Sequence, residues 1–143
     1  MDYYTAIEIS AAGMTAERTR IEAATLNLAN MNVSAPPGAA GYRPVTAVIR
    51  PGRAVFPALM GIDGGATPGP QAHIVPQVGT GARLSYEPGH PDADANGMVA
   101  YPNIDHTGEM MTVVTAMRAY EANLAALQVS RTLVSKALEI GGQ

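Results

Sequence analysis

The sequence contains no cysteine and no tryptophan, and its 143 residues include a single phenylalanine, Phe56. The lack of cysteine excludes disulfide bonds, thiolate metal sites and cysteine nucleophiles. Leu, Ile, Val and Phe together number 28, whereas alanine alone accounts for 25 of the hydrophobic residues. A chain of this composition can bury little large apolar surface, so we expect it to complete its core against partners.

The sequence also has no large excess of positive or negative charge and no long apolar run. The net charge is -3 and Lys and Arg form no cluster, which argues against binding to nucleic acid or to anionic membranes. No apolar run is long enough to span a bilayer, so we expect no membrane insertion. The first ten residues, MDYYTAIEIS, have no basic stretch, and we do not expect a cleaved secretory signal.

Proline and glycine are concentrated in the middle of the chain. Ten of the 11 prolines and 11 of the 15 glycines lie between residues 35 and 97. This distribution predicts a helix at 1–34, a loop-rich and β-rich middle segment at 35–104, and a helix at 105–143. The fold class is therefore predicted to be mainly α with a small β region, in which the two terminal helices pack as a coiled coil and form one domain.

The C-terminal segment has the clearest periodicity in the chain. Its side chains follow a 3-4-3-4 spacing through four heptads, interrupted only by Arg131: Met110, Val113, Met117, Tyr120, Leu124, Leu127, Arg131, Val134 and Leu138. A stripe that repeats every 3.5 residues favours a partner helix in a left-handed coil. Asp105 is the predicted N-cap, Glu109 lies in the first turn, and Gly141 and Gly142 end the helix.

The N-terminal segment carries a thinner stripe. Ile7, Met14, Ile21 and Leu28 recur at seven-residue intervals, with small or polar residues between them, and Asp2 or Thr5 is the predicted cap. The two terminal helices pair either parallel or antiparallel. Because one thin stripe gives a weak two-helix coil, we interpret both helices as built for a multi-helix assembly.

The middle segment contains three candidate strands. Residues 44–50 and 82–88 alternate as strands do, and 73–78 is a third candidate that Pro76 confines to an edge. Residues 60–71 are predicted to form a loop. Together these features predict a short twisted β-ribbon with long loops.

A calcium site is the most specific chemical candidate. In DADANG (92–97), Asp92, Asp94 and Asn96 stand at the first, third and fifth positions of an EF-hand loop, with Gly97 at the sixth. The twelfth position is Asn103, which lacks the required carboxylate. The alternative is a tight turn in which Asp and Asn side chains accept from local backbone amides.

Catalytic and cofactor-binding patterns are missing from the sequence. His73, His90 and His106 have no metal-site spacing, and we interpret them as solvated loop residues. Neither a phosphate-binding glycine loop nor a nucleophile elbow is present. The sequence therefore predicts no enzyme and no cofactor.

Three asparagines, Asn27, Asn30 and Asn32, close the N-terminal apolar run. One of the last two, Asn30 or Asn32, is predicted to be the left-handed residue that ends the helix. Asn27 lies beside Leu28, and we interpret it as a polar residue that fixes the register of neighbouring helices at some cost in stability.

These asparagines also belong to motifs that resemble one protein family. NLANMN (27–32), followed by GYRP (41–44), resembles the N-terminal signature of the flagellar rod and hook family. YEPGHPDADANGMVAYPNID (86–105) looks like the central motif of its proximal-rod members, and 109–141 is similar to the family's C-terminal helix. The resemblance covers about two thirds of the chain and leaves residues 45–81 unmatched.

The resemblance implies a structural axial subunit of the bacterial flagellar basal body. Such a subunit polymerises with copies of itself and with other rod proteins into the proximal rod, which transmits torque across the periplasm. The family's subunits are exported uncleaved through the flagellar type III export apparatus, and their terminal helices form the inner layers of the tube.

The predicted assembly interface combines the two stripes with the asparagines. We expect the stripes to be completed, and the chain ends fully ordered, only against neighbouring subunits. The predicted interface residues are Ile7, Met14, Ile21, Asn27, Leu28, Asn30, Met110, Val113, Met117, Tyr120, Leu124, Leu127, Val134 and Leu138. The rival hypotheses are a calcium-binding module at 92–97 and a helical adaptor or secretion chaperone that stays in the cytoplasm.

Overall fold

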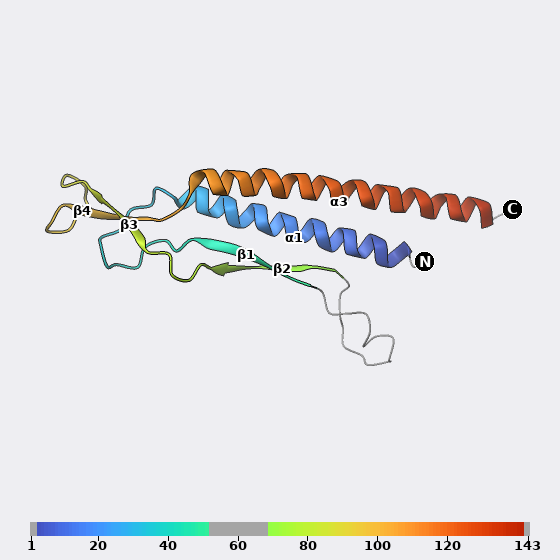
Figure 1. The fold of residues 1–143 in the computed structure, drawn as a ribbon, viewed down its shortest axis with the longest axis horizontal. Helices are drawn as coiled ribbons and strands as arrows, with labels where there is room; N and C mark the ends of the chain where they lie inside the picture. The colour runs from blue at the N-terminus through green and yellow to red at the C-terminus, as the bar shows by residue number, and fades with distance from the viewer. Residues whose placement is uncertain (1–2, 52–68, 142–143) are drawn as a thin grey trace, which may run out of the picture. The chain divides into compact units, whose positions relative to one another are not determined.

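The computed structural model describes residues 3–51 and 69–141 of the chain, in two long helices and four strands (Figure 1). In chain order the elements are α1 (Tyr3–Asn30), β1 (Val45–Arg50), β2 (Gln71–Pro76), β3 (Ala82–Tyr86), β4 (Met98–Pro102) and α3 (His106–Gly141). The predicted fold class, mainly α with a small β region, is confirmed.

The chain forms two compact units, and each contains part of both helices. Unit 1 comprises Met1–Thr19, Val48–His73 and Thr115–Gln143, and unit 2 comprises Arg20–Ala47 and Ile74–Val114. The predicted loop at 60–71 lies almost entirely outside the described residues, apart from the short approach to β2.

The asparagine-rich C-terminal end of α1 has a different conformation from the one predicted. No non-glycine residue among those described has a positive φ, so the prediction of a left-handed Asn30 or Asn32 is wrong. Instead, the Val33 amide donates to the Asn30 carbonyl (3.1 Å) in a tightened last turn, and the Asn30 side chain donates to the Leu26 carbonyl (2.8 Å). At the other end, Thr5 lies inside α1, so it is not the cap, and Asp2 is outside the described residues.

The start of α3 follows the sequence closely. Asp105 Oδ1 accepts from the Thr107 amide (3.0 Å), and the Asp105 carbonyl accepts from the Glu109 amide (2.9 Å). These two bonds are those of an N-cap residue, so the predicted cap is confirmed. Glu109 lies in the first turn of the helix, and α3 is described through Gly141.

The helices are antiparallel neighbours within each unit, which resolves the alternative that the sequence left open. In unit 1, a Cβ built on Gly13 would lie 2.9 Å from Asn123 Nδ2. In unit 2, Asn27 Nδ2 donates to Glu109 Oε1 (2.7 Å). Within unit 2, the end of α1 thus meets the first turn of α3, while Ala23 and Ala24, about a turn earlier on α1, line one hollow with Thr112, about a turn later on α3.

Small residues occupy the buried face of the helix pair. The buried apolar side chains of the two helices are mostly alanines: Ala16, Ala23, Ala24, Ala116 and Leu127. Because alanine and glycine have almost no side chain, the two backbones approach closely while little large apolar surface is buried.

The β region consists of two two-stranded sheets, β1–β2 and β3–β4. β3 and β4 are antiparallel, with Ala82 opposite Pro102 and Tyr86 opposite Met98. The strands predicted at 44–50, 73–78 and 82–88 correspond to β1, β2 and β3, and Pro76 is the last residue of β2.

The sequence prediction missed β4. Ala35 pairs with Ala100 on the side of β4 that faces away from β3, so β4 has a backbone partner on both edges. Val99 and Ala100 are consecutive and both buried. A strand buried on both faces lacks the alternation that identified the other strands.

Candidate assembly surface

Asn27 is a buried side chain whose hydrogen-bonding groups all have partners. Its exposed fraction is 1%. Nδ2 donates to the Val45 carbonyl (2.8 Å) and to Glu109 Oε1 (2.7 Å), while Oδ1 accepts from the Val45 amide (2.8 Å) and from the Tyr42 hydroxyl (3.0 Å). An asparagine amide has two donors and two acceptor lone pairs, so its capacity is fully used.

These four bonds join segments that are far apart in the sequence. The paired bonds to Val45 imitate a β-bridge, so the side chain of Asn27 holds the first residue of β1 against α1 as a neighbouring strand would. The bond to Glu109 holds the first turn of α3 against the same point. We call Asn27, Tyr42, Val45 and Glu109 the Asn27 cluster; all four lie in unit 2.

The NLANMN and GYRP motifs meet in this cluster. Tyr42 supplies the hydroxyl that donates to Asn27, and the Pro44 carbonyl accepts from the Gln77 amide (2.8 Å), next to the start of β1. Partial burial, and then the nearby Glu109 carboxylate, raise the pKa of Tyr42 above its ordinary value. A tyrosine hydroxyl is protonated at neutral pH even at its ordinary pKa of about 10, and the raised pKa extends the pH range over which this donating form persists.

The DADANG segment forms the tight turn between β3 and β4. Asp94 Oδ1 accepts from the backbone amides of Asn96 (2.8 Å) and Met98 (2.9 Å), and Gly97 has φ +74°. The Met98 amide is the main cause that lowers the pKa of Asp94, since it stabilises the ionised carboxylate. The turn interpretation of this segment is confirmed.

The neighbouring Asp92 is engaged elsewhere. Its carboxylate accepts from the Ser34 hydroxyl (2.6 Å) and lies 3.8 Å from His90 Nδ1. Ser34 follows α1, so this bond ties the turn to the chain leaving the helix. Over residues 3–51 and 69–141, no group of three or more His, Cys, Asp or Glu side chains is arranged to hold a metal ion.

Half of the predicted stripe residues on α3 are exposed to solvent. Met110, Met117, Leu124 and Leu138 are exposed, Val113, Tyr120 and Val134 are half-buried, and Leu127 is buried. The residues that face α1 lie one position away from the stripe: Glu109, Ala116 and Asn123. Apart from Leu127, the buried side chains of α3 are thus small, and Met110, Met117 and Leu124 are left exposed.

The stripe on α1 is more enclosed. Ile7, Met14, Ile21 and Leu28 are all half-buried, and Asn30 is half-buried beside them. The buried positions of this helix are again smaller neighbours, such as Gly13 and Ala16.

The sequence analysis did not identify a second group of exposed apolar side chains on α3. Val129, Leu133 and Ile140 are spaced four and seven residues apart, so they share a helix face, and all three are exposed. Leu133 and Ile140 are a heptad apart, so a search for a second stripe beside the first would have found this face.

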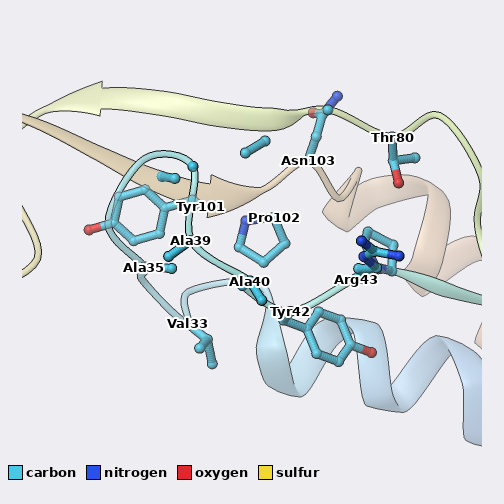
Figure 2. Close-up of a pocket in the computed structure, with 16 residues that line it drawn as sticks. Val33, Ala35, Ala39, Ala40, Tyr42, Arg43, Thr80, Tyr101, Pro102 and Asn103 are labelled. Atoms are coloured by element: carbon cyan, nitrogen blue, oxygen red, sulfur yellow. The ribbon is translucent and has the colours of Figure 1, made fainter.

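Unit 2 also contains a hollow of about 180 Å³. Figure 2 shows that its lining comes from the segment after α1, from Thr80 and from the end of β4. Tyr101, on this rim, donates its hydroxyl to Glu87 (3.1 Å), and desolvation followed by the Glu87 interaction raises the pKa of Tyr101. The lining offers no concentration of ionisable groups, so we assign it no chemistry.

The comparisons with known proteins extend over nearly the full chain. The family model for the C-terminal part of flagellar basal-body rod FlgEFG proteins matches residues 95–140. The chain is 32% identical to the flagellar basal-body rod protein FlgC of Bacillus subtilis over 149 aligned positions, which cover 99% of both chains. It is 34% identical to FlgC of Salmonella typhimurium over 134 positions, which cover 94% of both chains. It is 33% identical to FlgC of Aquifex aeolicus over 139 positions, which cover 97% of both chains.

The chain belongs to the FlgC family of flagellar basal-body rod proteins. It is thus a structural subunit of the proximal rod of the flagellar basal body, in a family of structural proteins without known enzymatic activity. Within the part of the FlgC-family chain that the structure describes, neither helix has the length and apolar character needed to cross a membrane.

Proposed function

We propose that this rod subunit polymerises with copies of itself and with other rod proteins through the predicted stripes on α1 and α3, and that the resulting tube transmits torque across the periplasm. In this proposal, residues 1–34 and 105–143 form one coiled-coil domain, and 35–104 is the segment outside it. The subunit reaches the rod through the flagellar type III export apparatus, without cleavage of a signal peptide.

The observation that supports this interface is the exposure of the α3 stripe. Met110, Met117 and Leu124 lie at seven-residue intervals, and each has an exposed side chain although α1 is packed along the same helix. Burying a large apolar side chain stabilises an assembly by roughly 1.5–3 kcal/mol. Several such residues in register give each subunit a strong tendency to add further helices.

Leu124→Asp tests this interface. Leu124 is 38% exposed, so aspartate is tolerated in the free subunit, whereas a carboxylate buried between subunits lacks a partner. We expect the variant to be exported. A strain in which it replaces the native subunit should be non-motile and should lack rods. Soft-agar motility, electron microscopy of basal bodies and immunoblots of the exported fraction measure these outcomes.

Ala125→Asp is the matched control. It places the same charge on the next residue of α3, which is also exposed but points about 100° away around the helix. Motility should survive this change. Motile cells with Leu124→Asp, or equal loss in both variants, would show that the stripe is not the interface.

A further inference from the structure

We propose that Asn96 and Gly97 form a deamidation site that the folded turn between β3 and β4 protects, so that Asn96 is converted to isoaspartate in chains whose turn is open. Asn96 is the only one of the six asparagines in the sequence that precedes glycine. The other five precede Leu, Met, Val or Ile. The inference concerns a single chain and does not rest on the proposed assembly interface.

The reaction needs a backbone nitrogen that can reach the asparagine side chain. The Gly97 nitrogen attacks Asn96 Cγ, the new bond closes a five-membered succinimide, and Nδ2 leaves as ammonia as the Gly97 nitrogen gives up its proton. Water then opens the ring at either carbonyl and yields aspartate or isoaspartate, so water is the only co-reactant. Glycine favours the attack because no Cβ crowds the nitrogen and because its backbone rotates freely once the turn is open.

The turn itself requires glycine at this position. Gly97 has φ +74°, a backbone conformation that residues with a Cβ seldom adopt. A Cβ built there would also lie 2.9 Å from Tyr86 Cε2 and 3.0 Å from Pro88 Cβ. The residue that allows the chain to make this turn is therefore the same residue that makes Asn96 labile when the turn opens.

The folded turn holds Asn96 in an unreactive conformation. The Gly97 amide donates to the Asp94 carbonyl (2.9 Å), and the Asn96 amide donates to Asp94 Oδ1 (2.8 Å). Because no described non-glycine residue has a positive φ, these bonds define a type I turn followed by a left-handed glycine. Closing the succinimide ring requires Asn96 Cβ and the Gly97 nitrogen to lie on the same side of the Cα–C bond, so Asn96 must first rotate out of the turn.

Further backbone bonds hold this turn closed. The Met98 amide donates to Asp94 Oδ1 (2.9 Å), the Asp94 amide donates to the Met98 carbonyl (2.9 Å), and the Glu87 amide donates to the Gly97 carbonyl (2.8 Å). Asn96 is exposed, but Gly97 is buried, so a base in solution reaches the Gly97 amide only when the turn opens. Folded chains therefore react through their opened minority.

The isoaspartate product cannot restore the original turn. Its main chain runs through Cβ and Cγ, which adds a methylene between residues 96 and 97. The loop of residues 95–97 then no longer fits the register in which Tyr86 is opposite Met98. Isoaspartate at position 96 is thus a lasting chemical record that the turn was open.

The test compares the native chain in purified basal bodies with the same chain in urea, aged at the same mildly alkaline pH and temperature. Peptide mass spectrometry measures the mass increase of deamidation at Asn96, and chromatography separates isoaspartate from aspartate. We expect the reaction to be at least about ten-fold slower in basal bodies, since an opening that costs about 1.4 kcal/mol leaves about a tenth of the chains reactive. The other five asparagines are the internal control and should stay unmodified over the same time.

Two substitutions separate the chemistry from the fold. In urea, Gly97→Ala should slow the reaction several-fold because the added Cβ crowds the nitrogen, and this effect does not depend on whether the variant folds. In basal bodies, Asp94→Ala should accelerate the reaction several-fold because it removes the side-chain bonds to the amides of Asn96 and Met98. In urea, where these bonds are absent, Asp94→Ala should leave the rate nearly unchanged.

Asp92→Ala is the matched control for Asp94→Ala. It removes an equal charge two residues earlier, from a carboxylate that accepts from the Ser34 hydroxyl (2.6 Å). The protection of Asn96 in basal bodies should survive this change. Equal acceleration by Asp92→Ala and Asp94→Ala would show that local charge, and not the turn, controls the rate.

The native chain decides the inference by itself, so a variant that forms no rods leaves it testable. Equal rates in basal bodies and in urea would overturn the proposed protection. Absence of deamidation at Asn96 in urea, or an unchanged rate with Gly97→Ala there, would overturn the proposed chemistry. None of these results depends on whether Leu124→Asp blocks rod formation, so the two proposals fail separately.

Discussion

In unit 2, the buried amide of Asn27 has a partner for each donor and acceptor, whereas in unit 1 the large apolar side chains of Leu138 and Ile140 are 72% and 80% exposed. Each arrangement departs from the usual placement of polar and apolar side chains. A satisfied polar cluster makes the local structure unique, while exposed apolar residues make further association favourable. The satisfied polar contacts and the exposed apolar side chains therefore belong to different residues.

The largest effect on stability is expected from a substitution that removes the hydrogen bonds of Asn27 but leaves no cavity at its position. Asn27→Leu removes the bonds that Asn27 makes to both backbone groups of Val45 and to Glu109, and we expect it to lower the free energy of unfolding by about 3 kcal/mol or more. Urea denaturation of the free subunit measures the change. Met117→Ala, at an exposed position of unit 1, should change it by less than about 0.5 kcal/mol; equal effects would remove the contrast between the buried amide and the exposed methionine.

A smaller effect is expected at the turn between β3 and β4. An alanine Cβ at Gly97 would lie 2.9 Å from Tyr86 Cε2 and 3.0 Å from Pro88 Cβ, in a backbone with φ +74°. We expect Gly97→Ala to destabilise unit 2 by about 1–3 kcal/mol. Gly38→Ala separates the two causes, because Gly38 has φ +84° but no atom within 4 Å of the built Cβ. If both variants lose the same stability, the contact with Tyr86 contributes nothing.

The smallest expected effect concerns pH. Because the pKa of Asp94 is lowered in the folded chain, its stabilising contribution is present above the ordinary carboxyl pKa and is lost as the pH falls through the folded value. Asp94→Asn keeps an acceptor oxygen but does not titrate, so its stability should depend less on pH below about pH 4. Thermal unfolding of both proteins from neutral to acidic pH measures this difference, and identical pH profiles would contradict it.

The sequence was most informative where one local pattern determined the structure. The helices, the Asp105 cap and the turn at Asp94 were all predicted, because capping and turn bonds lie within a few residues of each other. The heptad also identified Met117 and Leu124 as members of one stripe, although nothing in the sequence indicated whether α1 would cover them.

The contacts that the sequence did not reveal are long-range. Asn27 reaches Val45 and Glu109, 18 and 82 residues away, and no local pattern specifies such partners. β4 was missed for a related reason, because its apolar residues reflect pairing with β3 and with Ala35 instead of alternation. The left-handed asparagine was a wrong prediction because a tightened turn at Val33 ends the helix equally well.

The close approach at Gly13 has a consequence for how the chain distributes its few large side chains. Where α1 meets α3, the nearest residues are glycine, alanine and the amide of Asn123. Among the described residues of the two helices, Leu127 is the only large apolar side chain that is buried. The short side chains at this contact leave most of the large apolar residues of α3 exposed, among them Met117, Leu124 and Leu138.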